Sequence, residues 1–218
     1  MQKALLCTTL EYFVKALKGN FKEAEDRTLR LPGCDKETLE LFLYWACNKA
    51  LPDFQADIGH EPGNTRKDLV HANQLRLAKL WILGDACLLS RLQNDAMRSL
   101  GSMLGSANVS VEAIRYAFAE SAEGSMLRKA LAHELALDYI NDRYLAGEAE
   151  NIGAIPGVFA ATTNVVFTCY NNKCAHEPEG FTGARGDCWG FLVPEEAESG
   201  VELDDTSEAE RSLEQEDE

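Results

Sequence analysis

The sequence predicts an α+β protein that is predominantly helical, with a small residual sheet. Apolar residues recur every three or four positions over most of residues 36–144, which is the period of a helix with one buried face. By contrast, Thr28–Leu31 alternates polar and apolar residues ahead of a turn at Pro32-Gly33, as a short half-buried strand does. The 218 residues are enough for one domain with additional segments, or for two small domains.

The apolar period places six helices along the chain. We expect them over residues 3–17, 35–49, 69–86, 90–104, 110–121 and 125–144. Asp35, Ser90, Ser110 and Ser125 stand where four of these helices begin. Their side chains are of the kind that accepts hydrogen bonds from the first unpaired backbone N–H groups of a helix. These four residues are therefore the predicted N-caps.

Large apolar side chains on these helices define the expected core. Phe42 and Trp45 lie on the stripe of the second helix, and Leu77, Trp81, Gly84 and Leu88 continue at intervals of four, three and four residues. We interpret Phe42, Trp45, Leu77 and Trp81 as core residues. The alternative is that some of them anchor a partner protein, because aromatic side chains dominate the energetics of interfaces.

Two stretches have no apolar period. Residues 52–67 contain Gly59, Pro62 and Gly63, so we expect a loop there. From residue 147 onward glycines punctuate the chain, and Val165-Val166-Phe167 is the one run that is typical of a strand. We therefore expect residues 147–194 to be an irregular region that contains glycines and cysteines.

The charge is concentrated at the end of the chain. Residues 195–218 hold twelve acidic residues and one basic residue, which is −11 of the formal net charge of −15. So few apolar residues cannot offset the entropy of ordering, and we expect a disordered acidic tail. It either keeps the protein in solution or docks a basic partner. The acidic balance argues against nucleic-acid binding, and no apolar run is long enough to span a membrane.

The sequence contains seven cysteines. It has no secretory signal, because residues 1–19 lack an uninterrupted apolar core. We therefore expect an intracellular protein, cytoplasmic or nuclear, with reduced thiols. Cys7, Cys34, Cys47 and Cys87 lie in apolar helical patterns and are expected to be buried small hydrophobic residues.

One cluster has residue types that bind metals. Cys169, Cys174, His176 and Cys188 lie in a glycine-rich segment and could converge on zinc, although their spacing matches none of the common structural zinc sites. Free thiols with a solvated histidine are the favoured interpretation. A small zinc-binding protein that uses the Cys169–Cys188 region stays open as an alternative function.

The other histidines give no catalytic pattern. His133-Glu134 has no second histidine at metalloprotease spacing and is expected to be a surface pair, and His60 and His71 are expected to be solvated. The sequence has no glycine-rich phosphate loop and no nucleophile elbow. We therefore expect no enzyme, and assign no catalytic residue, cofactor or metal site.

The order of short motifs along residues 1–104 is the most specific signal. It comprises the segments Lys3–Cys7, Glu11–Phe13 and Gly19–Ala24, Leu31-Pro32, the set Asp35, Thr38, Leu39, Phe42, Leu43 and Trp45, the stretch Leu80–Ala86, and Leu92-Gln93-Asn94. In order and spacing it resembles the BTB/POZ domain, especially the fungal type. Residues 125–131 resemble the helical extension of fungal members, and we assign residues 105–146 to such an extension.

The resemblance implies a protein–protein interaction module with a BTB/POZ-like helical cluster. Such modules self-associate as homodimers, and many recruit a cullin scaffold as ubiquitin-ligase adaptors, using the face around the helix that begins at Asp35 and the first helix. The family opens with a strand hairpin beside the strand matched by Thr28–Leu31, and this sequence has no counterpart. We therefore expect an N-terminally incomplete domain, either the shortened form of a longer protein or a truncated remnant without function.

Two further departures concern single motifs. Gly84-Asp85-Ala86 stands where the family has Ala-Asp-Lys, and Trp45 is followed by Ala46-Cys47-Asn48 in place of an aromatic residue and a Thr-Gly turn. A glycine inside a helix costs stability unless packing requires it.

Overall fold

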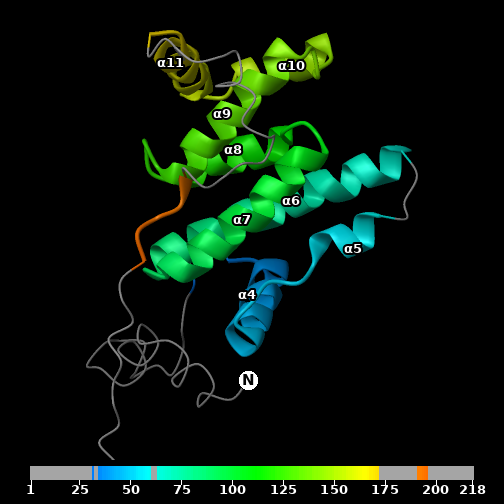
Figure 1. The fold of residues 1–218 in the computed structure, drawn as a ribbon, viewed down its shortest axis with the longest axis vertical. Coiled ribbons are helices and arrows are strands. Elements are labelled where there is room, and N and C mark those ends of the chain that lie inside the picture. Colours follow the sequence, from blue (N-terminus) through cyan, green and yellow to red (C-terminus); the bar gives the residue numbers. More distant parts are fainter. Residues whose placement is uncertain (1–30, 32–33, 60–62, 172–190, 196–218) are drawn as a thin grey trace, which may run out of the picture.

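The computed structural model describes residues 31, 34–59, 63–171 and 191–195, and every regular element within them is a helix (Figure 1). The predicted predominance of helix is confirmed. No strand occurs among these residues, and Leu31 is not in a regular element. The rest of the predicted strand and the helix expected over residues 3–17 lie outside the described residues.

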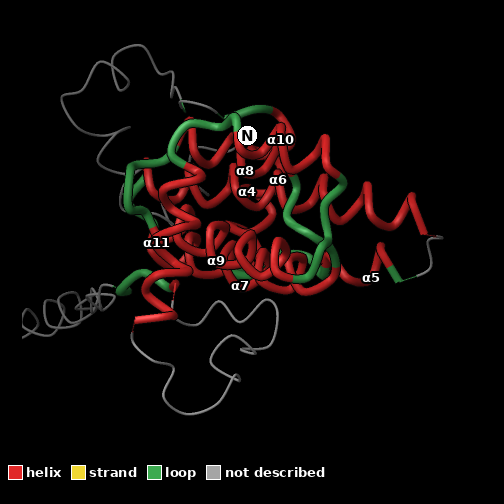
Figure 2. Tube along the Cα trace, turned by 90° about the horizontal axis from the view of Figure 1, so that it is seen from above, coloured by secondary structure: helices red, strands yellow, loops and turns green. Residues whose placement is uncertain are grey.

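Two long helices cross the middle of the described part side by side, with α4 and α5 on one side of the pair and the remaining helices on the other (Figures 1 and 2). The pair is α6 (Gly63–Ala86) and α7 (Ser90–Ser106). Around it lie α4 (Lys36–Asn48), α5 (Phe54–Ile58), α8 (Val111–Glu120), α9 (Met126–Ile140), α10 (Ala146–Gly153) and α11 (Val158–Asn171).

The core contains the residues that the apolar period predicts. Phe42, Trp45, Leu77 and Trp81 are all at most 3% exposed. So are the predicted apolar positions of α7 and α9, namely Leu92, Ala96, Met97, Leu100, Met103, Leu104, Leu127, Leu131 and Leu135. The interpretation of the four large residues as core is confirmed.

A tight connection joins α6 to α7. Leu89 N–H donates to the Gly84 carbonyl at 2.8 Å and Leu88 N–H to the Asp85 carbonyl at 3.1 Å, which is the Schellman arrangement of a helix end. Leu88 stands at the left-handed position of this turn, with φ +56°, and is 85% exposed. The prediction that Leu88 continues the buried stripe is therefore wrong, because the helix ends before it.

Three of the four predicted N-caps precede a helix in the structure, and Ser90 is the exception. Asp35, Ser110 and Ser125 each accept a hydrogen bond from a backbone N–H in the first turn of α4, α8 and α9. Ser90 is instead the first residue of α7, and Leu89 precedes it without a side-chain cap. Leu89 is the N-cap instead, since its carbonyl accepts the Gln93 N–H at 3.0 Å, the first hydrogen bond of the α7 ladder.

The loop expected over residues 52–67 is partly wrong. Asp53 caps the short helix α5 by accepting the Gln55 N–H at 2.9 Å, and α6 begins at Gly63. Residues 63–66 are exposed, so they show no apolar period although they are helical. Residues 60–62 lie outside the described part.

The irregular region expected from residue 147 is wrong as far as residue 171, because α10 and α11 occupy most of this segment. Val165-Val166-Phe167 is helical, within α11. Ile152, Ile155 and Val158 are buried and fix the two helices to the core. The expected domain limits stay predictions, and the acidic tail lies outside the described residues apart from Glu195.

Candidate protein interaction site

The start of α4 is fixed to α6 by charged groups. Asp35 Oδ1 accepts the backbone N–H and the hydroxyl of Thr38, both at 2.8 Å, while Lys79 Nζ donates to Asp35 Oδ2 at 2.5 Å. The hydrogen bond from Lys79, followed by that from the Thr38 N–H, lowers the pKa of Asp35 to about 2. Arg76, one helical turn before Lys79 on α6, donates from its Nε to Glu37 Oε2 at 2.9 Å.

The other end of α4 is fixed to α7. The indole N–H of Trp45 donates to Asp95 Oδ2 at 2.8 Å. The other carboxylate oxygen of Asp95, Oδ1, accepts a hydrogen bond from Arg98 Nη1, also at 2.8 Å. Phe42 stacks on Trp45 with ring centroids 6.3 Å apart. Because the buried indole N–H has a partner, the aromatic residues can lie in the core without an unsatisfied donor.

These contacts leave the opposite side of α4 exposed. We call the exposed residues Glu40, Tyr44 and Cys47 the outer α4 face. Tyr44 is 45% exposed, which is high for a large aromatic side chain. The outer α4 face is thus an aromatic residue one helical turn from the carboxylate of Glu40, on a helix held at both ends.

The motif residues that carry the family resemblance meet in space. Gly84 and Asp85 at the end of α6 lie against Gln93 in the first turn of α7, and Gln93 Nε2 donates to Asp85 Oδ1 at 3.1 Å. Trp45 reaches Asp95 two residues further on. Trp45, Gly84, Asp85 and Gln93 are motif residues and Asp95 directly follows its motif, so one contact set around the α6–α7 pair joins positions up to 50 residues apart.

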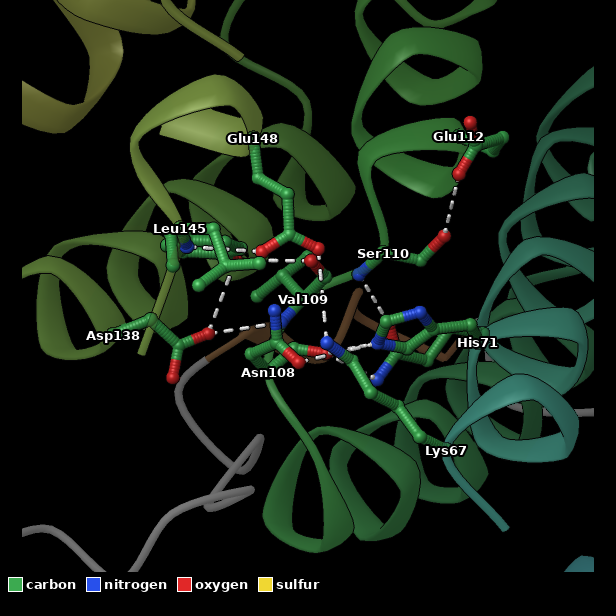
Figure 3. Close-up of polar contacts among 11 residues, drawn as sticks. Lys67, His71, Asn108, Val109, Ser110, Glu112, Asp138, Leu145 and Glu148 are labelled. Carbon is green, nitrogen blue, oxygen red and sulfur yellow. Dashed lines mark hydrogen bonds and ion pairs between the residues drawn. The ribbon is translucent and has the colours of Figure 1, made fainter. Parts of the chain in front are cut away.

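A buried polar cluster holds the connection between α7 and α8 (Figure 3). Gln74 donates to the carbonyls of Met103 and Asn108, at 3.4 and 3.2 Å, and accepts the Ser110 N–H at 2.7 Å. His71 Nε2 lies 3.1 Å from the Asn108 carbonyl and is partly buried, so the expectation of a solvated His71 is wrong. Asn108 and Ser110 lie between α7 and α8, so at these two residues the cluster pairs backbone groups that no helix ladder satisfies.

A carboxylate from α9 completes this cluster. Asp138 is 0% exposed and its Oδ2 accepts the Val109 N–H at 2.8 Å and the Tyr144 hydroxyl at 3.2 Å. Burial, followed by the neighbouring Asp138 carboxylate, raises the pKa of the Tyr144 hydroxyl far above its ordinary value. Tyr144 therefore stays a hydrogen-bond donor, and the groups hold a loop in place.

Only one of the four candidate zinc ligands lies in the described part of the chain. Cys169 lies on α11, and Cys174, His176 and Cys188 lie outside the described residues, as does His60. Among the residues that the structure does describe, no three His, Cys, Asp or Glu side chains are grouped as metal ligands. The zinc alternative stays a prediction.

His133 and Glu134 do not form an exposed surface pair. Both lie on α9, with Nδ1 of His133 3.7 Å from Oε1 of Glu134, and the Glu134 side chain is only 5% exposed. The prediction of a surface pair is wrong for Glu134, because α9 is covered on several sides and its polar residues lie among packed helices.

The described cysteines behave differently from one another. Cys87 is 2% exposed, and burial raises the pKa of its thiol to about 11. Cys34 is partly buried and burial also raises the pKa of its thiol, whereas Cys47 is exposed. All three are free, as predicted, but the expectation of burial is wrong for Cys47, which faces outward from α4. Cys7 lies outside the described residues.

A shallow hollow lies between α5 and α7, lined by Pro52, Phe54, Gln55, Ser102 and Met103 among others. It is open to solvent and brings no charged pair together.

Over the described ranges, no helix has both the length and the apolar character that a bilayer crossing needs.

Sequence reasoning missed the polar residues that tie helices together. Gln74, Asn94 and Asp138 stand among buried apolar positions, and a polar residue at such a position was the available signal in the sequence.

Comparison of the chain with protein-family models, with curated proteins and with solved structures gave no match.

Proposed function

We propose that this chain is a protein–protein interaction module of the BTB/POZ type, which self-associates and serves as an adaptor for a cullin ubiquitin ligase. The observation that carries the proposal is the outer α4 face. It belongs to the helix that begins at Asp35, the element on which the resemblance places dimer and cullin contacts.

The packing of α4 supports a docking role for this face. Asp35–Lys79, Glu37–Arg76 and Trp45–Asp95 hold the helix against α6 and α7. A helix fixed in this way loses little further freedom when a partner binds, so more of the contact energy appears as affinity. Tyr44 would be the central anchor, since tyrosine is enriched among residues that dominate interfaces.

The contact set formed by the motif residues supports the family-like cluster. Gly84, Gln93 and Asp95 join the α6–α7 pair to the Trp45 end of α4. A small residual sheet that includes Thr28–Leu31 belongs to the same proposal, as does an intracellular location.

Self-association is tested by light scattering of the full chain over a concentration series. We expect a homodimer for the wild type and a monomer for Tyr44→Glu, because a buried carboxylate at the centre of an interface lacks a partner. Tyr139→Glu is the matched control, since Tyr139 is a partly exposed tyrosine on α9. A wild type that stays monomeric at all concentrations, or a Tyr44→Glu variant that still dimerises, contradicts the proposal.

The adaptor role is tested separately by calorimetric titration of the chain with the N-terminal domain of a cullin. We expect binding to the wild type and to Tyr139→Glu, and weaker binding to Tyr44→Glu. Absence of binding to a chain that is folded and dimeric would remove the adaptor role while leaving self-association in place.

A further inference from the structure

A short segment far along the chain is seated on the helices. Residues 191–195, Phe-Leu-Val-Pro-Glu, run beside α7 as the orange stretch in Figure 1. Phe191, Leu192 and Val193 pack against the hydrophobic core while staying partly exposed. The segment makes no regular helix beyond its first residue, so its backbone groups need partners outside a helix ladder, from side chains or from water.

Asn94 on α7 pairs with this backbone in both directions. Its Nδ2 donates to the Val193 carbonyl at 2.9 Å, and its Oδ1 accepts the Val193 N–H at 2.8 Å. Both bonds reach the same residue, 99 positions away. A side-chain amide that takes the N–H and the carbonyl of one residue imitates the pairing of a neighbouring strand. It therefore selects an extended backbone, whatever the side chain at that position.

Contacts on either side of Val193 add side-chain preference. Asn94 Nδ2 donates a second hydrogen bond to Glu195 Oε1 at 2.8 Å, and Arg98 Nη2 lies 3.8 Å from the same carboxylate oxygen. Two residues before Val193, the Phe191 ring lies against the His133 ring of α9, with centroids 5.7 Å apart. We call Asn94, Arg98 and His133 the Asn94 site.

The chemistry of Asn94 makes this more than a chance contact. The side chain is 2% exposed, and a buried amide requires partners for its two donor protons and its oxygen. The segment supplies a partner for each of them. Helix residues are thus arranged to recognise a peptide with three features in fixed order: an aromatic ring, an extended backbone residue and a carboxylate.

We propose that the Asn94 site is a binding site for an extended peptide of a partner protein, with an aromatic residue two positions before the clamped residue and an acidic residue two positions after it. Residues 191–195 occupy it within the same chain and compete with that peptide. A tethered competitor has a high effective concentration, so the partner binds appreciably only when the chain's own segment is displaced.

The test uses the full chain and a fluorescein-labelled synthetic peptide with the sequence of residues 190–196, followed by fluorescence anisotropy. Val193→Pro removes the N–H that donates to Asn94 and so weakens the chain's own segment. We expect this variant to bind the peptide at least about tenfold more tightly than the wild type does, because the site is no longer occupied. The double variant Phe191→Ala, Glu195→Ala weakens the same segment by a second route and should behave alike.

Specificity is checked on both partners. Adding Asn94→Leu to Val193→Pro should abolish peptide binding, whereas adding Asn48→Leu, an exposed asparagine on α4, should leave it unchanged. A peptide N-methylated at the position of Val193 keeps every side chain but cannot donate, and should bind about tenfold more weakly.

Three outcomes would overturn the proposal, provided that circular dichroism shows folded variants. The first is equally weak binding to the wild type and to both segment variants. The second is binding that survives Asn94→Leu. The third is a wild-type dimer that Asn94→Leu abolishes, because the segment then belongs to exchange between two copies. That result is distinguishable from the proposed function, which depends on Tyr44.

Discussion

Gly84 of α6 lies so close to Gln93 of α7 that a Cβ at Gly84 would stand 2.9 Å from Gln93 Cγ and 3.3 Å from the Gln93 backbone nitrogen. The glycine therefore permits the close approach of the two helices behind their tight turn. This accounts for a glycine, which has no Cβ, at a position inside a helix. The cost of a glycine inside a helix is offset by packing.

Gly84→Ala is expected to destabilise the protein by about 1–3 kcal/mol, because the added methyl group must displace Gln93 and strain its bond to Asp85. Gly147→Ala in α10 is the control, since a Cβ there meets nothing within 4 Å. It should leave stability unchanged or raise it by up to about 1 kcal/mol. Urea unfolding of the two variants measures the difference, and a neutral Gly84→Ala would contradict the packing argument.

The helices with one buried face could be predicted from the sequence because burial and period coincide there. Phe42, Leu77 and Leu131 mark such faces, and the structure buries all three. The first turn of α6 and the whole of α11 escaped prediction for opposite reasons. Residues 63–66 are exposed and have no apolar period. In α11, Val165-Val166-Phe167 has strand-forming residue types and predicted a strand, but the segment is helical, and Val158 at the start of the helix is the residue that is buried.

The polar contacts could not be predicted from local pattern. Gln74 reaches Ser110 over 36 positions, and Asn94 reaches Val193 over 99. A period assigns polar residues to the surface, so it gives no partner for a buried amide. The identification of Asp35 as an N-cap succeeded because its hydrogen bond is local, whereas its bond to Lys79 spans 44 positions and needed the structure.

Leu88→Gly is expected to stabilise the protein by about 0.5–1 kcal/mol. Leu88 stands at φ +56°, where a side chain is strained and glycine is favoured at the end of a helix. Since the side chain is 85% exposed, little packing is lost. Leu88→Ala keeps the strained backbone and should leave stability nearly unchanged. Thermal unfolding compares the two, and a Leu88→Gly variant less stable than Leu88→Ala would show that the leucine itself stabilises the turn.

Gln74→Leu is expected to cost about 1–3 kcal/mol, because it removes the acceptor of the buried Ser110 N–H and the donor to two carbonyls. Gln55→Leu is the matched control. Gln55 also donates to side chains and backbone of α7, but largely in solvent, so its loss should change stability by less than about 0.5 kcal/mol. Equal urea midpoints for the two variants would argue against a role of the buried cluster in stability.

Asp95→Ala is expected to lower the free energy of unfolding by about 1–3 kcal/mol, because the indole N–H of the buried Trp45 loses its acceptor. Asp95→Asn keeps a side-chain oxygen at that place and should recover most of the loss. Asp68→Ala, an exposed aspartate on α6, controls for the removal of a charge. Chemical unfolding followed by tryptophan fluorescence measures the series, and no recovery in Asp95→Asn would mean that charge, rather than the hydrogen bond, matters.

Asp35 gives a pH dependence with a defined sign. Its pKa lies at about 2 in the folded protein against an ordinary 3.8, so the carboxylate contributes stability above about pH 4 that is lost as the pH falls toward 2. Because the Asp35 side chain is 44% exposed, solvent screening keeps this contribution below about 1 kcal/mol. Asp35→Asn retains a capping oxygen but loses the ion pair with Lys79.

We therefore expect Asp35→Asn to be less stable than the wild type at pH 6 and to approach it at pH 2. Lys79→Met removes the other partner of the pair, and its stability gap from the wild type should narrow over the same pH window. Urea midpoints measured from pH 6 to pH 2 give both gaps. A gap that keeps its size down to pH 2 in both variants would mean that Asp35 and Lys79 stabilise α4 by packing and not by their charges.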